Sequence, residues 1–264
     1  MRNWFHSAAG IVSVILLSAS VILTAIVCLF INPNTNSSIV RDLLIGLAAN
    51  LLGIIITVSF VQYFINRQNN RNEKEEEIKR IKRYNRHTSM LIRRYQELFY
   101  ALTTRIKDRK YIEYDSVFNR QFTFADMADM YLPSLTQTDA IMESTIVLFF
   151  NAEQNLRDYF LKMIENIDYR YNEKLYEIIQ TFVTDSINKD MSGVIIGNKT
   201  VNMGDKPLAK VISSWISDEA EDWLGKYKRG ELTNNIMYSY VVFYYHLRNQ
   251  AKHIKEYLEC MNSI

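Results

Sequence analysis

Residues 39–110 have the sequence IVRDLLIGLAANLLGIIITVSFVQYFINRQNNRNEKEEEIKRIKRYNRHTSMLIRRYQELFYALTTRIKDRK, and the rest of the chain is organised around them. Its first part, residues 43–65, carries no charged side chain and is long enough to cross a hydrocarbon core of about 30 Å as a helix. Neither Gly nor Pro occurs between Gly53 and Pro133, so nothing in the sequence demands a break at the membrane surface. We therefore expect one helix to continue from the membrane through residue 110.

An earlier apolar run predicts a second crossing of the membrane. Residues 8–31 lack charge, so we expect spans at about 8–31 and 39–65, which together make residues 1–66 a transmembrane hairpin. Arg2 precedes the first span, basic residues are dense after the second, and the loop between them has none. The positive-inside rule then places both termini in the cytoplasm. These features predict a multi-pass membrane protein.

Charge and composition divide the remainder of the chain. The 264 residues carry a net charge of +2. Residues 67–110 hold fourteen Lys or Arg and six Asp or Glu, a net charge of +8, whereas residues 111–264 have a net charge of −7. Few Gly and Pro among many helix formers favour an all-α membrane protein. We expect a basic juxtamembrane helix at 67–110, a cytosolic helical domain at 111–264, and one small β-hairpin formed by residues 194–196 and 200–201.

Small and polar side chains recur along both spans. They permit two interpretations: close packing between helices, or a water-filled pore that an oligomer builds from the polar faces. The candidate residues are Asn50, Gly53, Thr57, Ser20 and Thr24. Because the second span has no ring of charge in its core, any such pore is expected to be weakly selective.

A heptad-like stripe continues below the membrane. Its members follow one another at steps of three and four, and they are Ile78, Ile81, Asn85, Thr88, Ile92, Tyr95, Phe99, Leu102 and Ile106. One interpretation is a coiled coil in a homo-oligomer such as a tetramer, with Asn85 fixing the register. The other is that the stripe packs inside the helical bundle of its own chain. The sequence leaves both open.

Basic and aromatic side chains alternate along the same helix. The part nearest the membrane, residues 67–83, is expected to contact anionic lipid head groups. The later part lies beyond the reach of the charged surface, and there Lys and Arg can neutralise phosphates while Tyr stacks on bases. The candidate ligand-binding residues are Arg86, Arg93, Arg94, Tyr95, Arg105, Lys107, Arg109 and Lys110. The ligand expected is a nucleotide or a single-stranded oligonucleotide.

A short motif near the C-terminus offers a different chemistry. Arg248, Asn249 and His253 form a pattern that resembles the R-N-x-x-x-H signature of HEPN ribonucleases, which are small all-helical domains. The resemblance implies that Arg248 and His253 converge across a dimer, with Arg holding the scissile phosphate and His acting as acid or base. No His or Cys spacing predicts a metal site, and no cofactor is expected. We expect that the chain is not an enzyme. The alternative is that it is a membrane-tethered ribonuclease.

The layout as a whole resembles a class of bacterial proteins. Paired spans, a basic helix and a helical domain ending in the aromatic-rich segment 238–248 are similar to membrane effectors of anti-phage defence and abortive infection, in particular the channel effectors of Hailong systems. The resemblance implies a homo-oligomeric channel that depolarises the membrane. It also implies a ligand made by an operon partner, since that family is held shut by single-stranded oligodeoxyadenylate and opens when the oligomer is destroyed. A non-catalytic membrane-anchored scaffold is the remaining hypothesis.

Overall fold

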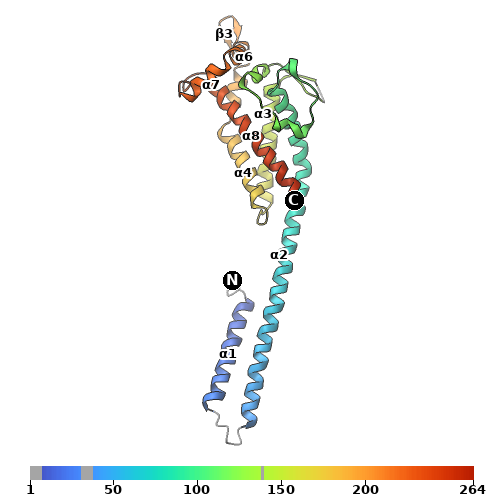
Figure 1. The fold of residues 1–264 in the computed structure, drawn as a ribbon, viewed down its shortest axis with the longest axis vertical. Helices are drawn as coiled ribbons and strands as arrows, with labels where there is room; N and C mark the ends of the chain where they lie inside the picture. Colours follow the sequence, from blue (N-terminus) through green and yellow to red (C-terminus); the bar gives the residue numbers. More distant parts are fainter. Residues whose placement is uncertain (1–7, 31–37, 138–139) are drawn as a thin grey trace. The chain divides into compact units, whose positions relative to one another are not determined.

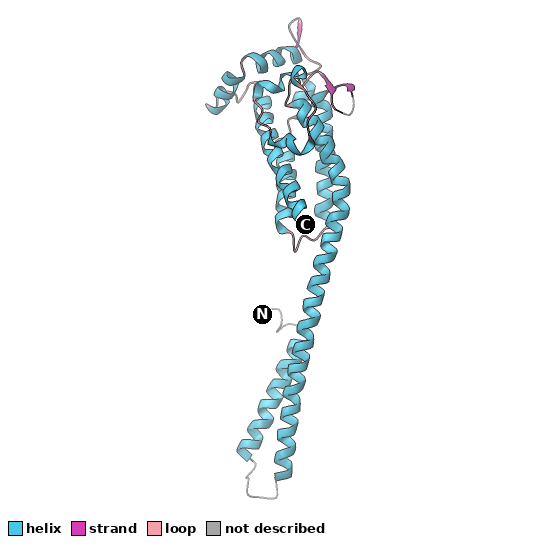
Figure 2. Ribbon diagram, turned by 45° about the vertical axis from the view of Figure 1, so that its right-hand side comes forward, coloured by secondary structure: helices cyan, strands magenta, loops and turns pink. Residues whose placement is uncertain are grey.

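The computed structural model describes residues 8–30, 38–137 and 140–264. The described chain is mostly helical, as predicted (Figure 1). It divides into two compact units, Met1–Glu76 and Glu77–Ile264, and the helix α2 (Ser38–Leu102) runs through both. Strands are short and lie near one end of the second unit (Figure 2).

The first unit contains α1 (Ala8–Phe30) and the beginning of α2, so both predicted spans lie in helices. In the described part of the chain, Asp42–Leu102 is the one helix long and apolar enough to cross a membrane by length and composition. A hydrogen bond joins the two helices, because the buried Ser20 hydroxyl donates to the carbonyl of Ala48 at 3.3 Å. Most of the large apolar side chains described in the rest of this unit are exposed.

The C-terminal end of α2 differs from the prediction. The helix was expected to reach Lys110, but it ends at Leu102. Arg109 folds back and donates from its guanidinium to the backbone carbonyls of Ala101, at 2.6 Å, and Thr104, at 3.2 Å. The last carbonyls of a helix lack partners within it, and a basic side chain satisfies them. The prediction was wrong because a side chain from the following loop, rather than Gly or Pro, ends the helix.

Four helices surround the core of the second unit. They are the end of α2, α3 (Thr145–Asn166), α4 (Glu173–Asn188) and α8 (Met237–Ser263). Both α3 and α8 pack against α4, and Figure 1 shows these helices running side by side. Aromatic side chains fill the space between them. The centre of the Tyr95 ring lies 5.0 Å from the centre of the Phe149 ring and 6.3 Å from that of Phe182.

This packing decides between the two interpretations of the heptad-like stripe. The members that are buried within the chain are Ile81, Thr88, Ile92, Tyr95, Phe99 and Leu102. Asn85 also has a partner in the chain, because its amide oxygen accepts a hydrogen bond from the hydroxyl of Tyr257 at 2.9 Å. Burying a large apolar side chain stabilises a fold by about 1.5–3 kcal/mol. The stripe therefore serves the chain's own core, and these side chains are not available for a coiled coil between subunits.

The remaining elements connect and cover the bundle. They are three 3₁₀ helices, η1 (Ile106–Asp108), η2 (Tyr114–Asn119) and η3 (Phe124–Asp129), the strands β1 (Pro133–Leu135), β2 (Ala140–Ser144), β3 (Asn202–Met203) and β4 (Lys206–Pro207), and the helices α5 (Ser192–Gly197), α6 (Leu208–Asp218) and α7 (Ala220–Lys228). The strands form two antiparallel pairs, β1 with β2 and β3 with β4. In the first pair Ser134 lies opposite Ile141, and in the second Asn202 lies opposite Pro207.

The predicted β-hairpin is placed wrongly. Residues 194–196 belong to the helix α5, and the hairpin occurs a few residues later as β3 and β4. A short apolar run does not distinguish a strand from a buried helical turn, and Ile195 is fully buried. The turn instead uses Gly204, whose φ of +62° suits a residue without a Cβ atom. The pair formed by β1 and β2 was not predicted.

Candidate anion-binding groove

The structure gives three of the predicted ligand-binding residues other roles. Tyr95 is fully buried, so its ring cannot stack on a base. Arg105 donates to the carboxylate of Asp129 at 3.3 Å and to the hydroxyl of Ser217 at 2.7 Å. Arg109 holds the carbonyls at the end of α2. These side chains hold elements of the fold together.

The other predicted ligand residues lie at the surface. Arg86, Lys107 and Lys110 are exposed. Arg93 lies over the ring of Tyr114, with its guanidinium carbon 4.4 Å from the ring centre. Arg94 forms an ion pair with Glu97, 3.1 Å away on the next turn of the helix.

Two of the predicted residues share a hollow. A surface hollow of about 300 Å³ joins Arg109 and Lys110 to the rings of Tyr100 and Tyr111. Because Arg109 already donates to backbone carbonyls, this hollow offers less free positive charge than its composition indicates.

A second concave surface concentrates more positive charge. It has a volume of about 460 Å³ and lies between the segment that joins η2 to η3 and the helix α8. We call it the cationic groove, and its lining residues are Phe118, Arg120, Gln121, Phe122, Tyr244, Arg248, Ala251, Lys252 and Lys255. Along α8 the basic residues follow one another at steps of four and three, which places them on one face of the helix.

The groove combines cations with aromatic rings. Among its lining residues there is no Asp, Glu or His, so the positive charge inside it is not neutralised locally. One carboxylate approaches from outside the lining, since Glu256 lies 3.8 Å from Lys252, but that lysine side chain is 72% exposed and the pair is weak. Arg248 lies 5.8 Å from the ring centre of Tyr244, and the Phe122 ring packs edge-on against the same tyrosine.

Arg120 differs from the other cations because it is attached to another element. Its guanidinium donates to the hydroxyl of Thr104 at 3.0 Å and lies over the ring of Tyr100, 4.8 Å from the centre. Both partners belong to the end of α2 or the turn that follows it. The groove therefore has one wall on α8 and a basic side chain on the other wall that touches α2.

The predicted catalytic residues do not meet within one chain. Arg248 lines the cationic groove. His253 instead lies close to two carboxylates, Asp185 on α4 at 3.5 Å and Glu256 at 3.9 Å. Asn249 is exposed. Convergence of Arg248 and His253 across a dimer remains a prediction.

In the first unit, the predicted pore or packing residues separate into two groups. Ser20 takes part in the contact between α1 and α2, and Thr24 donates to its carbonyl at 2.9 Å. Asn50, Gly53 and Thr57 are exposed. A Cβ atom added at Gly53 would meet no atom within 4 Å. The polar stripe on α2 is thus not used for packing among the described residues of this unit.

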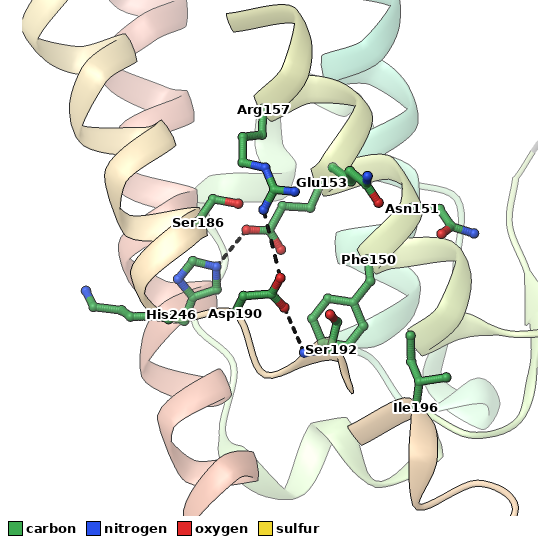
Figure 3. Close-up of a pocket in the computed structure, with 11 residues that line it drawn as sticks. Phe150, Asn151, Glu153, Arg157, Ser186, Asp190, Ser192, Ile196 and His246 are labelled. Carbon is green, nitrogen blue, oxygen red and sulfur yellow. Dashed lines mark hydrogen bonds and ion pairs between the residues drawn. The ribbon is translucent and has the colours of Figure 1, made fainter. Parts of the chain in front are cut away.

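A smaller cavity lies in the second unit between α3, α8 and the segment joining α4 to α5 (Figure 3). Its volume is about 80 Å³. At its edge the Nε2 atom of His246 lies 2.7 Å from a carboxylate oxygen of Glu153, and both residues are buried. Figure 3 shows the guanidinium of Arg157 directed toward Asp190, at 4.0 Å. The Ser186 hydroxyl and the Nδ1 atom of His246 have no partner among the described residues.

This cavity is best explained as part of the fold. Its polar side chains connect α8, α3 and the start of α5, where Asp190 accepts a hydrogen bond from the backbone of Ser192 at 2.8 Å. A space of about 80 Å³ is large enough for a few water molecules, the usual partners of buried polar groups that have none in the protein. No group of three or more His, Cys, Asp or Glu side chains in the described ranges could hold a metal ion.

The cationic groove is thus the strongest candidate site. Sequence reasoning selected Arg248 for a different chemistry and missed Arg120, Lys252 and Lys255. Comparison of the chain with protein-family models, curated proteins and solved structures found no match.

Proposed function

We propose that this chain is a homo-oligomeric effector of the bacterial inner membrane whose C-terminal domain binds an anionic ligand in the cationic groove. The observation that carries the proposal is a hollow of about 460 Å³ lined by four cationic side chains, the half-buried rings of Phe118 and Phe122, and no carboxylate. Arg and Lys neutralise phosphates, and rings stack on bases. A nucleotide or a single-stranded oligonucleotide has both features.

Binding rather than catalysis suits the groove. General acid–base catalysis near neutral pH requires a group whose pKa lies near the operating pH, most often His, Asp or Glu. None of these lines the groove, and His253 lies against Asp185. The ligand would therefore be recognised and released unchanged, which is the behaviour of a sensor.

The first unit supports an effector that acts on the membrane. We propose that both spans cross the bilayer, with both termini in the cytoplasm, and that several subunits, such as four, assemble around the polar stripe of α2. Asn50, Gly53 and Thr57 are exposed in a single chain, and polar groups within a span turn toward protein or water. Such an assembly forms a pore that depolarises the membrane, in keeping with the resemblance to effectors of anti-phage defence.

Binding of a short, mixed-sequence single-stranded DNA to the full-length chain in lipid nanodiscs tests the ligand site. The double variant R248Q/K252Q removes two charges from the groove and leaves Arg120 and Lys255 in place. A hydrogen bond to a charged group contributes about 1.5–3 kcal/mol, so the double variant should weaken binding by a hundredfold or more, about 1.4 kcal/mol per factor of ten. The control K210Q removes an exposed charge on α6 outside the groove. Equal losses in the two proteins would contradict the proposal.

Single-channel recordings in planar bilayers test the pore. The purified chain should conduct ions in one of two conditions, either with the DNA bound or without it. N50L replaces a polar side chain of the stripe and should therefore reduce or abolish this current. The variant L47A, at an exposed position of the same helix, is the control. Absence of conductance under both conditions would refute the pore, while DNA binding would still support the sensor.

A further inference from the structure

Arg120 belongs to two structures at once. It lines the cationic groove, and it follows η2, where its backbone N–H donates to the carbonyl of Val117. Its guanidinium also contacts the end of α2, through a 3.0 Å hydrogen bond to the Thr104 hydroxyl and the ring of Tyr100 beneath it. A ligand in the groove would therefore meet a side chain that already touches α2.

The contact with α2 leaves Arg120 able to bind an anion. A guanidinium has five N–H donors in a planar fork. Among the described residues the Arg120 side chain makes one hydrogen bond, from Nη1 to Thr104. The remaining donors can bind an anion without breaking the hydrogen bond to Thr104 or the contact with Tyr100. Arg forms such two-sided contacts better than Lys because its planar fork is rigid.

The end of α2 that Arg120 touches is built from side-chain contacts. The Tyr100 hydroxyl accepts a hydrogen bond from the backbone N–H of Lys110 and donates to the carbonyl of the same residue, both at 2.9 Å. Arg109 holds the carbonyl of Ala101 in this last turn and that of Thr104 just beyond it. Helix ends fray when such partners are lost, so the order of this turn depends on how firmly a few long side chains are held.

We propose that Arg120 couples occupancy of the cationic groove to the C-terminal end of α2. This inference rests on the proposed function, since it needs an anion in the groove. A bound anion holds the Arg120 guanidinium from the groove side while Thr104 holds it from the α2 side, so the last turn of α2 loses freedom. Because coupling is reciprocal, a change that orders this turn also tightens ligand binding by the same factor.

The coupling reaches the predicted second span through the continuity of α2. The turn in question ends the helix that begins at Ser38, and that helix includes the predicted second span. A ligand that orders one end of α2 thereby acts on the element that carries the polar stripe. Arg120 is a positioning residue in this scheme, and it transmits binding rather than performing chemistry.

Amide hydrogen exchange on the full-length chain in nanodiscs tests the coupling, with mixed-sequence single-stranded DNA as the probe. DNA should slow exchange in peptides from the α8 wall, residues 248–256, and in peptides from the end of α2, residues 98–105. The backbone N–H of Thr103, which donates to Phe99 at 2.9 Å, is a reporter in the second peptide. We expect exchange there to slow by about tenfold, equivalent to about 1.4 kcal/mol.

Two variants separate coupling from binding. R120K keeps the charge but lacks the fork, and T104V keeps the shape of the side chain but removes the acceptor hydroxyl. At saturating DNA, both should retain protection of the α8 wall and lose it at the end of α2. The matched control K255Q weakens binding from the opposite wall, so at saturation it should retain protection in both places.

The outcomes distinguish the inference from the function on which it rests. Protection of the α8 wall with unchanged or faster exchange at the end of α2 would overturn the coupling and leave the ligand site standing. Protection at the end of α2 that survives in R120K and T104V would also overturn it. If DNA slows exchange in neither segment of the unaltered protein, the proposed ligand site is contradicted and, with it, the coupling.

Discussion

Replacing Glu153 with Leu should destabilise the second unit by about 1–3 kcal/mol, the usual cost of leaving a buried polar group without its hydrogen-bond partner. Glu153 and His246 are 4% and 2% exposed, and their interacting atoms lie 2.7 Å apart. The substitution keeps most of the side-chain volume, so the loss comes from the polar contact rather than from a cavity. It leaves the His246 ring buried with neither nitrogen bonded to a described residue.

Urea unfolding of the full-length chain in detergent measures this loss. Fluorescence of Trp215 and Trp223 reports on the second unit, which contains both residues. The matched control D222A removes an ion pair with Lys226, whose partners are 53% and 34% exposed. Pairs of this kind contribute less than about 1 kcal/mol, so the control should unfold at nearly the same urea concentration as the unaltered protein.

A double variant completes the test. E153L/H246L replaces both polar partners with apolar groups, and such replacements are often close to neutral. It should therefore recover a large part of the stability lost in E153L. If E153L alone costs less than about 1 kcal/mol, the size expected of a surface pair, the reasoning about this buried contact is refuted.

Three further outcomes follow from local contacts. Y257F removes the hydroxyl that donates to the half-buried Asn85 and should cost about 0.5–1.5 kcal/mol in the same unfolding assay, the usual net contribution of one hydrogen bond. G204A should destabilise the turn between β3 and β4 by about 1–2 kcal/mol, since φ there is +62°; exchange of the β3 amides would then accelerate. The hydrogen bond from Lys199 lowers the pKa of Glu143 from 4.5 to about 2. The contribution of this ion pair to stability is complete above pH 4.5 and is lost as the pH falls toward 2. Because both side chains are more than a third exposed, high salt should suppress the difference in Tm between K199M and the unaltered chain.

The long helix and its apolar stripe could be predicted because they depend on local patterns. An uncharged run followed by a segment without Gly or Pro predicts a continuous helix, and α2 extends from Ser38 to Leu102. Periodicity also identified the buried face of α2. It could not show whether that face packs against another chain or against its own, because Asn85 finds its partner in Tyr257, far along the sequence.

The features that sequence reasoning missed depend on tertiary contacts. The end of α2 is determined by Arg109 folding back from a loop, which no helix-stop signal records. The groove joins Arg120 to residues of α8 such as Lys252, and segments so distant along the chain show no shared pattern. The buried pair of His246 and Glu153 is separated by 93 positions and is equally invisible to spacing.

The salt dependence of DNA binding measures how many phosphates the cationic groove contacts. Each phosphate neutralised on a single strand contributes about −0.7 to the slope of log K against log salt concentration. Contacts from Arg120, Arg248, Lys252 and Lys255 therefore predict a slope of about −3, reduced in magnitude by about 0.7 in K252Q or K255Q and unchanged in the control K210Q. A slope that stays the same in K252Q and K255Q would show that the DNA binds elsewhere and would contradict the assignment of the groove.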